Sequence, residues 1–156
     1  RDASGLASTA DASVVAEIER HRHRSIRKVT NDLERFQFNT QIAALMEFTN
    51  YLNLVWDSRS VDAGAWSEAV TTLLLLLAPT VPHITEELWE RTGHNYSVHG
   101  QPWPVWNEEV ARDPTITLVV QVNGKLRDKL TVATDISEDE AKSLALASDL
   151  VIFLVH

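Results

Sequence analysis

The sequence predicts a mainly α-helical protein, with an antiparallel bundle of helices over residues 1–112 and a small, incomplete α+β unit of β-β-α order over residues 113–156. Apolar side chains recur at spacings of three and four through residues 15–92, which is the period of an α-helix. Two β-rich runs then flank an Asn-Gly pair, which is typical of a hairpin. The sequence therefore predicts two units of different class.

The first helix, expected from about Val14 to Phe36, has two unlike faces. Its inward stripe should consist of the apolar residues Val15, Ile18, Ile26, Val29, Leu33 and Phe36. The opposite side carries a row of polar and basic residues, with Lys28 beside it: Arg20, Arg24, Arg27, Asn31 and Arg35. Such a row suits phosphate groups, but most rows of this kind are simply solvated charged faces.

A short turn at residues 37–39 should bring the second helix back antiparallel to the first. Asn39 or Thr40 is the expected N-cap. The apolar positions of the second helix recur at helical spacing: Ile42, Leu45, Met46, Thr49, Leu52 and Trp56.

A polar loop over residues 57–64 precedes a third helix, expected over residues 65–78. Its five consecutive leucines predict a buried helix, because it is apolar all round. Pro79 should end this helix, and Thr80 is the expected cap of a fourth helix that runs over residues 83–92 and stops at Gly93.

Residues 95–106 hold two prolines around a tryptophan and predict an extended strap whose aromatic rings pack across the bundle. The acidic residues 107–114 are expected to form a hinge between the two units. Asn123-Gly124 should then make a type I′ turn between strands over residues 115–122 and 125–132. Ser137 and Glu140 have the spacing of a capping box before a helix that ends near Ser148.

The charge pattern limits the possible functions. The net charge of −8 has the wrong sign for a protein built only to hold nucleic acid. However, residues 1–60 contain eight basic and eight acidic side chains, so the excess of acid lies later in the chain. The absence of cysteine excludes disulfides and thiol catalysis, and fits a cytoplasmic protein. The longest apolar run, residues 73–78, is far below the roughly 20 residues of a membrane span.

The catalytic and metal-binding motifs are weak. His83 and Glu87 lie four residues apart, as in some zinc sites, but a second histidine and a third ligand are missing, so no metal ligand is expected. His21 and His23 fall on different faces and are expected on the polar surface. The scattered glycines form no phosphate-binding loop. Four tryptophans could stack on bases, but packing in the core or strap is the expected role: Trp66, Trp89, Trp103 and Trp106.

Several motifs together identify a family. The segments Arg24-Ser25-Ile26-Arg27-Lys28-Val29-Thr30 and residues 38–48, Phe-Asn-Thr-Gln-Ile-Ala-Ala-Leu-Met-Glu-Phe, are followed by Pro82-His83 and Pro102-Trp103-Pro104. This order resembles the anticodon-binding helical domain of class I aminoacyl-tRNA synthetases. Residues 119–127, Val-Val-Gln-Val-Asn-Gly-Lys-Leu-Arg, narrow the resemblance to bacterial leucyl-tRNA synthetases. It covers roughly residues 16–148.

The resemblance implies a tRNA-binding C-terminal portion of an enzyme that attaches leucine to its tRNA. Members of the family bind ATP and magnesium in a separate catalytic domain, through motifs of the His-Ile-Gly-His and Lys-Met-Ser-Lys-Ser type that this sequence lacks. No cofactor is expected here. The expected partners are leucine tRNA and the catalytic domain, without a membrane.

The residues expected to contact the tRNA backbone are Arg20, Arg24, Arg27, Lys28 and Arg35, followed by Lys125, Arg127 and Lys129 of the hairpin. An alternative of a different class is a structural bundle that docks on the parent catalytic domain without touching tRNA. A third possibility, a self-standing hydrolase, has no motif to support it. The uncharged run Leu150–Val155 is expected to pair with a second copy or with the hairpin.

Overall fold

The computed structural model describes residues 12–58, 61–113, 115–122 and 125–147, without the side chains of residues 115, 122, 125 and 126. The chain divides into two compact units, one ending at Arg112 and the other beginning at Asp113. The expected run Leu150–Val155 and the Asn123-Gly124 turn lie outside the described residues.

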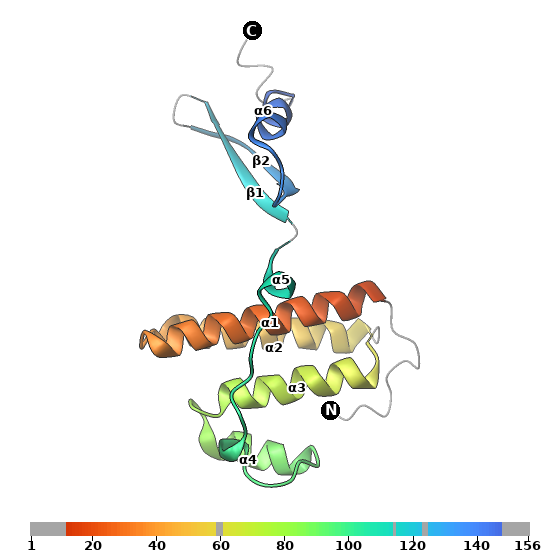
Figure 1. The fold of residues 1–156 in the computed structure, drawn as a ribbon, viewed down its shortest axis with the longest axis vertical. Helices are drawn as coiled ribbons and strands as arrows, with labels where there is room; N and C mark the ends of the chain where they lie inside the picture. Colours follow the sequence, from red (N-terminus) through yellow and green to blue (C-terminus); the bar gives the residue numbers. More distant parts are fainter. Residues whose placement is uncertain (1–11, 59–60, 114, 123–124, 148–156) are drawn as a thin grey trace. The chain divides into compact units, whose positions relative to one another are not determined.

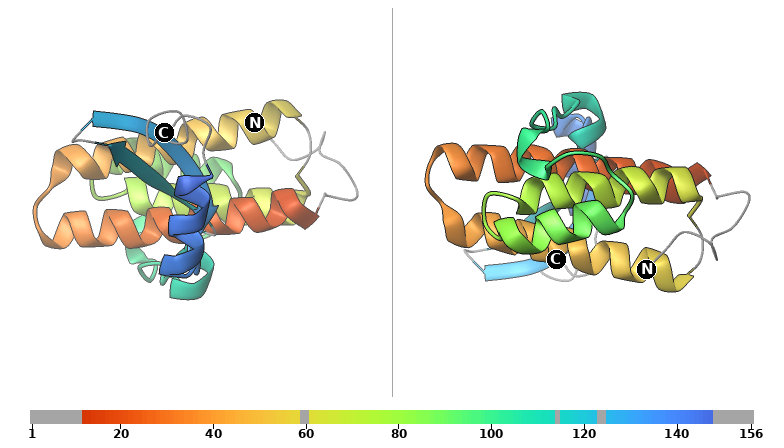
Figure 2. Two further views of the ribbon diagram at one scale, coloured as in Figure 1. Left: turned by 90° about the horizontal axis from the view of Figure 1, so that it is seen from above. Right: turned by 90° about the horizontal axis from the view of Figure 1, so that it is seen from below.

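The first unit is built on two long antiparallel helices (Figure 1). α1 spans Ala12–Glu34 and α2 spans Phe38–Ser58. α3, Ala63–Leu77, packs against both, and α4, Pro82–Arg91, packs on α3. The views from above and below also show α1 and α2 side by side along their length (Figure 2). The fold class predicted for this unit is confirmed.

The predicted apolar stripe of α1 is confirmed in the middle of the helix, but its last member is wrong. Ile18, Ile26 and Val29 are completely buried. Phe36, however, lies beyond the end of α1 with a positive φ of 56°, and 78% of its side chain area is exposed. A helical stripe continues only as far as the helix does, so the ring leaves the core when the backbone turns.

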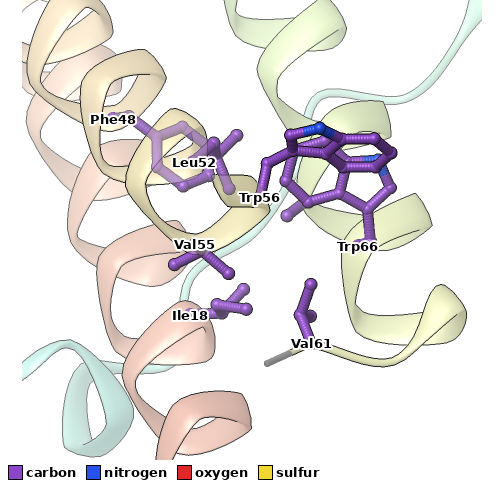
Figure 3. Packing of buried hydrophobic residues seen from close by; sticks show 8 residues of the cluster. Ile18, Phe48, Leu52, Val55, Trp56, Val61 and Trp66 are labelled. Carbon is purple, nitrogen blue, oxygen red and sulfur yellow. The ribbon is translucent and has the colours of Figure 1, made fainter. Parts of the chain in front are cut away.

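The largest core cluster lies between the N-terminal half of α1 and the facing parts of α2 and α3 (Figure 3). Trp56 and Trp66 pack with ring centroids 4.9 Å apart. The cluster gathers buried residues of all three helices and the turn before α3: Ile18, Phe48, Leu52, Val55, Trp56, Val61, Trp66 and Ala69. Burying this apolar area is the main force that fixes the helices together.

The helix starts differ from prediction in three places. α2 begins at Phe38, and the Gln37 carbonyl accepts the first helical hydrogen bond from Gln41 N at 3.1 Å, so neither expected residue caps it. α3 begins at Ala63, two residues before its expected start, and Asp62 caps it by accepting from Gly64 N and Ala65 N. Thr80 does not cap α4, because its hydroxyl instead accepts a hydrogen bond from the buried Gln41 amide at 2.9 Å.

α3 and α4 form a second packing layer that anchors the start of the strap. Trp89 and Val98 are buried against α3, and His94 stacks on Trp89 with centroids 3.9 Å apart. Glu86 accepts hydrogen bonds from Ser97 Oγ at 2.8 Å and from Val98 N at 3.1 Å. These contacts hold the short 3₁₀ turn η2, Val98–Gly100. Gly93 ends the fourth helical segment with a φ of 83°, as expected for a C-terminal glycine.

The expected hinge is wrong in part, because Glu108–Ala111 forms the short helix α5 and packs on α1. Asn107 caps it by accepting from Glu109 N at 2.9 Å. The strap therefore extends to Arg112 and belongs to the first unit.

The second unit contains a hairpin and a helix. β1, Thr115–Val122, pairs antiparallel with β2, Lys125–Ala133, and a bulge between Val120 and Gln121 leaves Arg127 outside the regular register. α6, Glu138–Leu146, packs on β2. Its predicted capping box is confirmed: Ser137 Oγ accepts from Glu140 N, and the Glu140 carboxylate accepts from Ser137 N.

Candidate nucleic-acid interface

α1 presents its basic residues on two flanks, because neighbouring elements pack on either side of it. One flank faces the strap and α5, and the other faces the start of α2. Arg24 and Arg35 have exposed side chains, while Arg20 and Arg27 are half-buried. The predicted row therefore meets different surroundings along the helix, and only part of it is exposed.

Arg27 is held by the strap. Its Nη1 donates a hydrogen bond to Glu108 Oε1 at 2.6 Å, and the other oxygen of Glu108 accepts from Trp106 Nε1 at 2.9 Å. The hydrogen bond from Trp106, the one from Arg27 and the Arg27 charge lower the pKa of the Glu108 carboxyl below its ordinary value. Glu108 thus remains ionised and forms an ion pair with Arg27.

Two further hydrogen bonds fasten the strap to α1. Trp103 Nε1 donates to Thr30 Oγ1 at 2.8 Å, and that hydroxyl donates in turn to the Ile26 carbonyl at 2.7 Å. Asn107 N donates to His23 Nδ1 at 3.0 Å. This last bond requires Nδ1 to be unprotonated. Burial, followed by the charge of Arg22, lowers the pKa of His23, although Glu19 acts in the opposite direction.

Trp106 also anchors the strap through packing. Its ring lies against a cluster of buried apolar residues from α1, α2 and α3: Ile26, Val29, Ala44, Leu45 and Leu76. The tryptophans therefore have the packing roles that were predicted, since Trp66 and Trp89 are in the core and Trp103 and Trp106 lie in the strap.

Lys28 is paired with a buried carboxylate at the other flank. Its Nζ lies 2.8 Å from Asp32 Oδ1, and Asp32 is 2% exposed. Burial raises the pKa of Asp32, but the hydrogen bonds of Lys28 and the Thr40 hydroxyl, with the charges of Lys28 and Arg35, outweigh it and lower the pKa overall. Lys28 is half-exposed, so it can neutralise Asp32 and still face a ligand.

The N-terminal basic residues are compensated by acidic neighbours on the same helix. Arg20 forms an ion pair with Glu17, and Arg22 Nε donates to Glu19 at 3.1 Å. Arg22 also lies 3.5 Å from Glu68 of α3. These pairs compensate the positive charge at this end of α1, as Glu108 does for Arg27 and Asp32 does for Lys28 farther along the helix.

A groove of about 440 Å³ runs between α1 and the first half of α2. Arg24, Lys28 and Asn31 line it from α1, and Thr40 and Glu47 face them from α2. Residues 24, 28 and 31 are spaced four and three apart, which places them on one side of α1. Arg24 and Lys28 form the groove part of the basic stripe with Asn31, and Arg35, which directly follows the last residue of α1, extends the stripe beyond the residues that line the groove.

His21 and His23 of α1 were expected on the polar surface, but each of them has a specific partner in the structure. His21 stacks on Tyr51 of α2 with ring centroids 3.7 Å apart, and His23 bonds the strap. These partners are far away in the sequence, and no local pattern announces them. Glu108 follows Trp106 and Asn107 in the sequence, but no sequence pattern predicts that it pairs with Arg27.

The hairpin candidates are on β2 of the second unit. Lys129 is exposed, whereas Arg127 is half-buried at the bulge. The side chain of Lys125 lies outside the described part of the structure. Lys129 pairs across the hairpin with Val119, so this unit presents a basic residue beside an exposed apolar one.

Neither a metal site nor a membrane span is found among the described residues. No group of three or more His, Cys, Asp or Glu side chains is arranged to hold a metal ion there. None of the helices in those segments is long and apolar enough to cross a membrane.

The chain resembles leucine–tRNA ligases over nearly its whole length. It is 48% identical to that of Dehalococcoides mccartyi strain BAV1 over 92% of this chain, and 50% identical to that of Rubrobacter xylanophilus over 96%. In both cases the matched region is 18% of the relative's length, so the chain spans less than a fifth of those proteins.

A solved structure has the same fold. It is the LeuRS of Agrobacterium radiobacter K84, titled as a ternary complex of LeuRS, tRNA and LeuAMS, and it aligns with a TM-score of 0.80 and 38% identity over 94% of this chain and 19% of that one. The family model described as the anticodon-binding domain of tRNA ligase matches residues 16–142. The chain therefore belongs to the family of anticodon-binding domains of tRNA ligases, and its similar relatives are leucine–tRNA ligases.

Proposed function

We propose that this chain is the part of a leucine–tRNA ligase that holds the tRNA backbone, and that it does so through the basic stripe of α1. The observation that carries the proposal is the groove between α1 and α2, where Arg24 and Lys28 face the same space and Arg35 continues the line. The solved relative titled as a complex with tRNA supports this choice of ligand.

Phosphate is the chemical group that fits this surface best. Arginine and lysine side chains at helical spacing match a charged backbone, and Asn31 adds an amide that can bind phosphate or ribose oxygens. Polar and charged residues line most of the groove, and Ala43, Ala44 and Phe48 supply its apolar part. Binding through this stripe should therefore depend little on tRNA sequence.

The strength of binding should be modest. The net charge of −8 opposes association with RNA, and Arg20 and Arg27 are already paired with carboxylates. With about three to five phosphate contacts, the logarithm of the association constant should fall against the logarithm of salt concentration with a slope of roughly −3 to −5. An electrophoretic mobility shift with purified leucine tRNA over a series of salt concentrations measures both quantities.

Charge-reversal variants test whether the basic stripe of α1 contacts tRNA. Changing Arg24 and Arg35 to Glu should abolish the shift at moderate salt, because both side chains are exposed and the core is untouched. The double variant Arg91→Glu, Lys142→Glu is the matched control, because it makes the same change in net charge at two exposed residues that do not line the groove. If the double reversal binds tRNA with the wild-type salt slope, α1 is not the contact surface.

A second candidate role is docking on the catalytic domain of the parent enzyme without contact to tRNA. It is favoured by the carboxylates that already compensate Arg20, Arg22 and Arg27. Under this alternative, the wild-type chain gives no tRNA shift at any salt concentration, which separates the two roles. If the wild type binds tRNA and the double reversal leaves binding unchanged, the hairpin residues Lys125, Arg127 and Lys129 are the other proposed contacts.

The chemistry of the proposed parent enzyme would take place outside this chain. We propose that ATP and magnesium serve its catalytic domain and that this chain binds no cofactor, because its sequence has no nucleotide-binding motif. The chain alone should then support neither leucine-dependent pyrophosphate exchange nor charging of tRNA. A cytoplasmic location is proposed with this function, since the similar relatives are ligases for tRNA.

A further inference from the structure

The turn between α1 and α2 exposes two aromatic rings at the end of the basic stripe. We name residues 36–40 the aromatic corner: Phe36, Gln37, Phe38, Asn39 and Thr40. Phe36 is 78% exposed and Phe38 is 52% exposed. The rings stand edge to face, with centroids 6.1 Å apart and planes at 76°. Exposing large apolar side chains to water costs free energy, so a pair of adjacent exposed rings is typical of a surface that binds a ligand.

Phe36 has a left-handed backbone conformation, and its ring points away from the core into solvent. Gln37 N donates to the Asp32 carbonyl at 2.8 Å and Phe36 N donates to the Leu33 carbonyl at 3.1 Å, which is the Schellman pattern of a helix C-terminus. Glycine is the usual residue at the left-handed position of this motif. Here a bulky residue takes a φ of 56° instead. Such outliers concentrate at functional sites.

The aromatic corner also encloses a polar-edged hollow. A pocket of about 390 Å³ is lined by Phe36, Phe38 and the three polar residues of the corner. The two amides and the Thr40 hydroxyl supply both donors and acceptors. A flat ring that stacks on phenylalanine could therefore also have its polar edge satisfied.

The pocket and the basic groove share one wall residue. Thr40 lines both of them, and Arg35 immediately precedes the aromatic corner. A chain that follows the stripe with its phosphates therefore reaches the pocket at the end of α1. Stacking platforms beside a cationic track are the common design of surfaces that bind unpaired nucleotides.

We infer that the aromatic corner binds an unpaired nucleobase of the RNA whose backbone lies along the basic stripe. This inference rests on the proposed function, because the stripe must first bring the RNA to the corner. It adds a contact that depends on a base being unstacked, whereas the stripe depends on charge alone. The chain should therefore prefer single-stranded or looped RNA to a blunt duplex of equal length.

The binding of short fluorescent RNA oligonucleotides, followed by anisotropy, tests the inference. Phe36→Leu keeps an apolar side chain but removes the aromatic face, and should weaken single-strand binding by about 5- to 150-fold, the range of one lost base stack. The salt slope should not change, because no phosphate contact is lost. Binding to the duplex should be unaffected, and Phe36→Trp should restore binding to the single strand.

Two controls separate stacking from unfolding and from general hydrophobicity. Phe36→Gly relieves the left-handed strain, so it should fold at least as well as the wild type and still lose single-strand affinity. Tyr96→Leu is the matched control: Tyr96 is an aromatic residue with a positive φ of 62° and 93% exposure, but it is not in the corner. This variant should bind like the wild type.

Other outcomes overturn the inference. Wild-type affinity with a normal salt slope in both Phe36→Leu and Phe36→Gly refutes the pocket while leaving the basic stripe intact. Absence of any RNA binding by the wild type refutes both the pocket and the proposed function. Concentration-dependent self-association that disappears in Phe36→Leu, with unchanged RNA affinity, assigns the corner to protein contacts instead.

Discussion

Arg27 of α1 and Glu108 of α5 meet at 2.6 Å although they lie 81 residues apart in the chain. The pair joins the last turn of the strap to the middle of the basic helix. It also means that one of the candidate phosphate ligands already holds an anion from its own chain. A phosphate group can displace this carboxylate only by opening the contact.

Glu108→Gln should release Arg27 and strengthen binding to tRNA. The neutral amide keeps an acceptor for Trp106 but no longer attracts the guanidinium by charge. The salt slope should become steeper by about one, because one more cation is available to phosphate. Glu109→Gln is the control, since Glu109 is the exposed neighbour and makes the same change in net charge. Equal effects of the two variants would reduce the result to general electrostatics.

Acidification should loosen the strap through His23. Its folded-state pKa is lowered below 6.5, so the neutral ring stabilises the fold above pH 6.5. That contribution is lost as the pH falls through 6.5 towards the folded-state value, because the unfolded chain takes up the proton first. The protection of the Asn107 amide against hydrogen exchange, relative to its intrinsic exchange rate at each pH, should fall over this range. His23→Gln should abolish that dependence; if it persists, another group is responsible.

Phe36→Gly should raise the stability of the first unit. The left-handed conformation costs a non-glycine residue about 1 kcal/mol, and the lost ring is already mostly in water. A higher melting temperature by calorimetry would confirm the strain. A lower one would show that the contact between Phe36 and Phe38 outweighs it. Phe36→Ala serves as a control, because it removes the ring and keeps the strain.

The hydrogen bond between Gln41 and Thr80 should matter for stability. Gln41 is 1% exposed and donates to the Thr80 hydroxyl at 2.9 Å. Thr80→Val should therefore cost about 1 to 3 kcal/mol in urea denaturation, since a buried amide loses its acceptor. The double variant with Gln41→Leu should be less destabilised than Thr80→Val alone. If Thr80→Val is neutral, the amide has another acceptor in solution.

The sequence predicted those parts of the structure that depend on local periodicity. The burial of Ile18, Ile26 and Val29 follows from their spacing, and the capping box at Ser137 needs only a neighbour three residues away. The stripe failed at Phe36, because the α-helix ends before that residue and its backbone turns left-handed. Period alone does not reveal such an end when the capping residue is not glycine.

The sequence predicted which basic residues the candidate site contains, but not how the neighbouring elements are arranged around them. Arg24, Lys28 and Arg35 were recognised as basic residues on one helix, yet the groove depends on the way α2 packs beside them. The partners of His23 and Arg27 are 84 and 81 residues away, so no local pattern could match them. Residues 107–114 were interpreted from their charge, whereas Trp106 and the packing of α5 decide their position.

The late position of the strap in the chain has a consequence for biosynthesis. At about 5 to 20 residues per second, a ribosome needs roughly 4 to 16 seconds to extend the chain from Arg27 to Glu108. During that interval the nascent bundle carries an uncovered apolar patch where Trp106 will pack, and an arginine without its carboxylate. Until Trp106 and Glu108 are made, this patch and this arginine are accessible to chaperones and to premature contact with RNA.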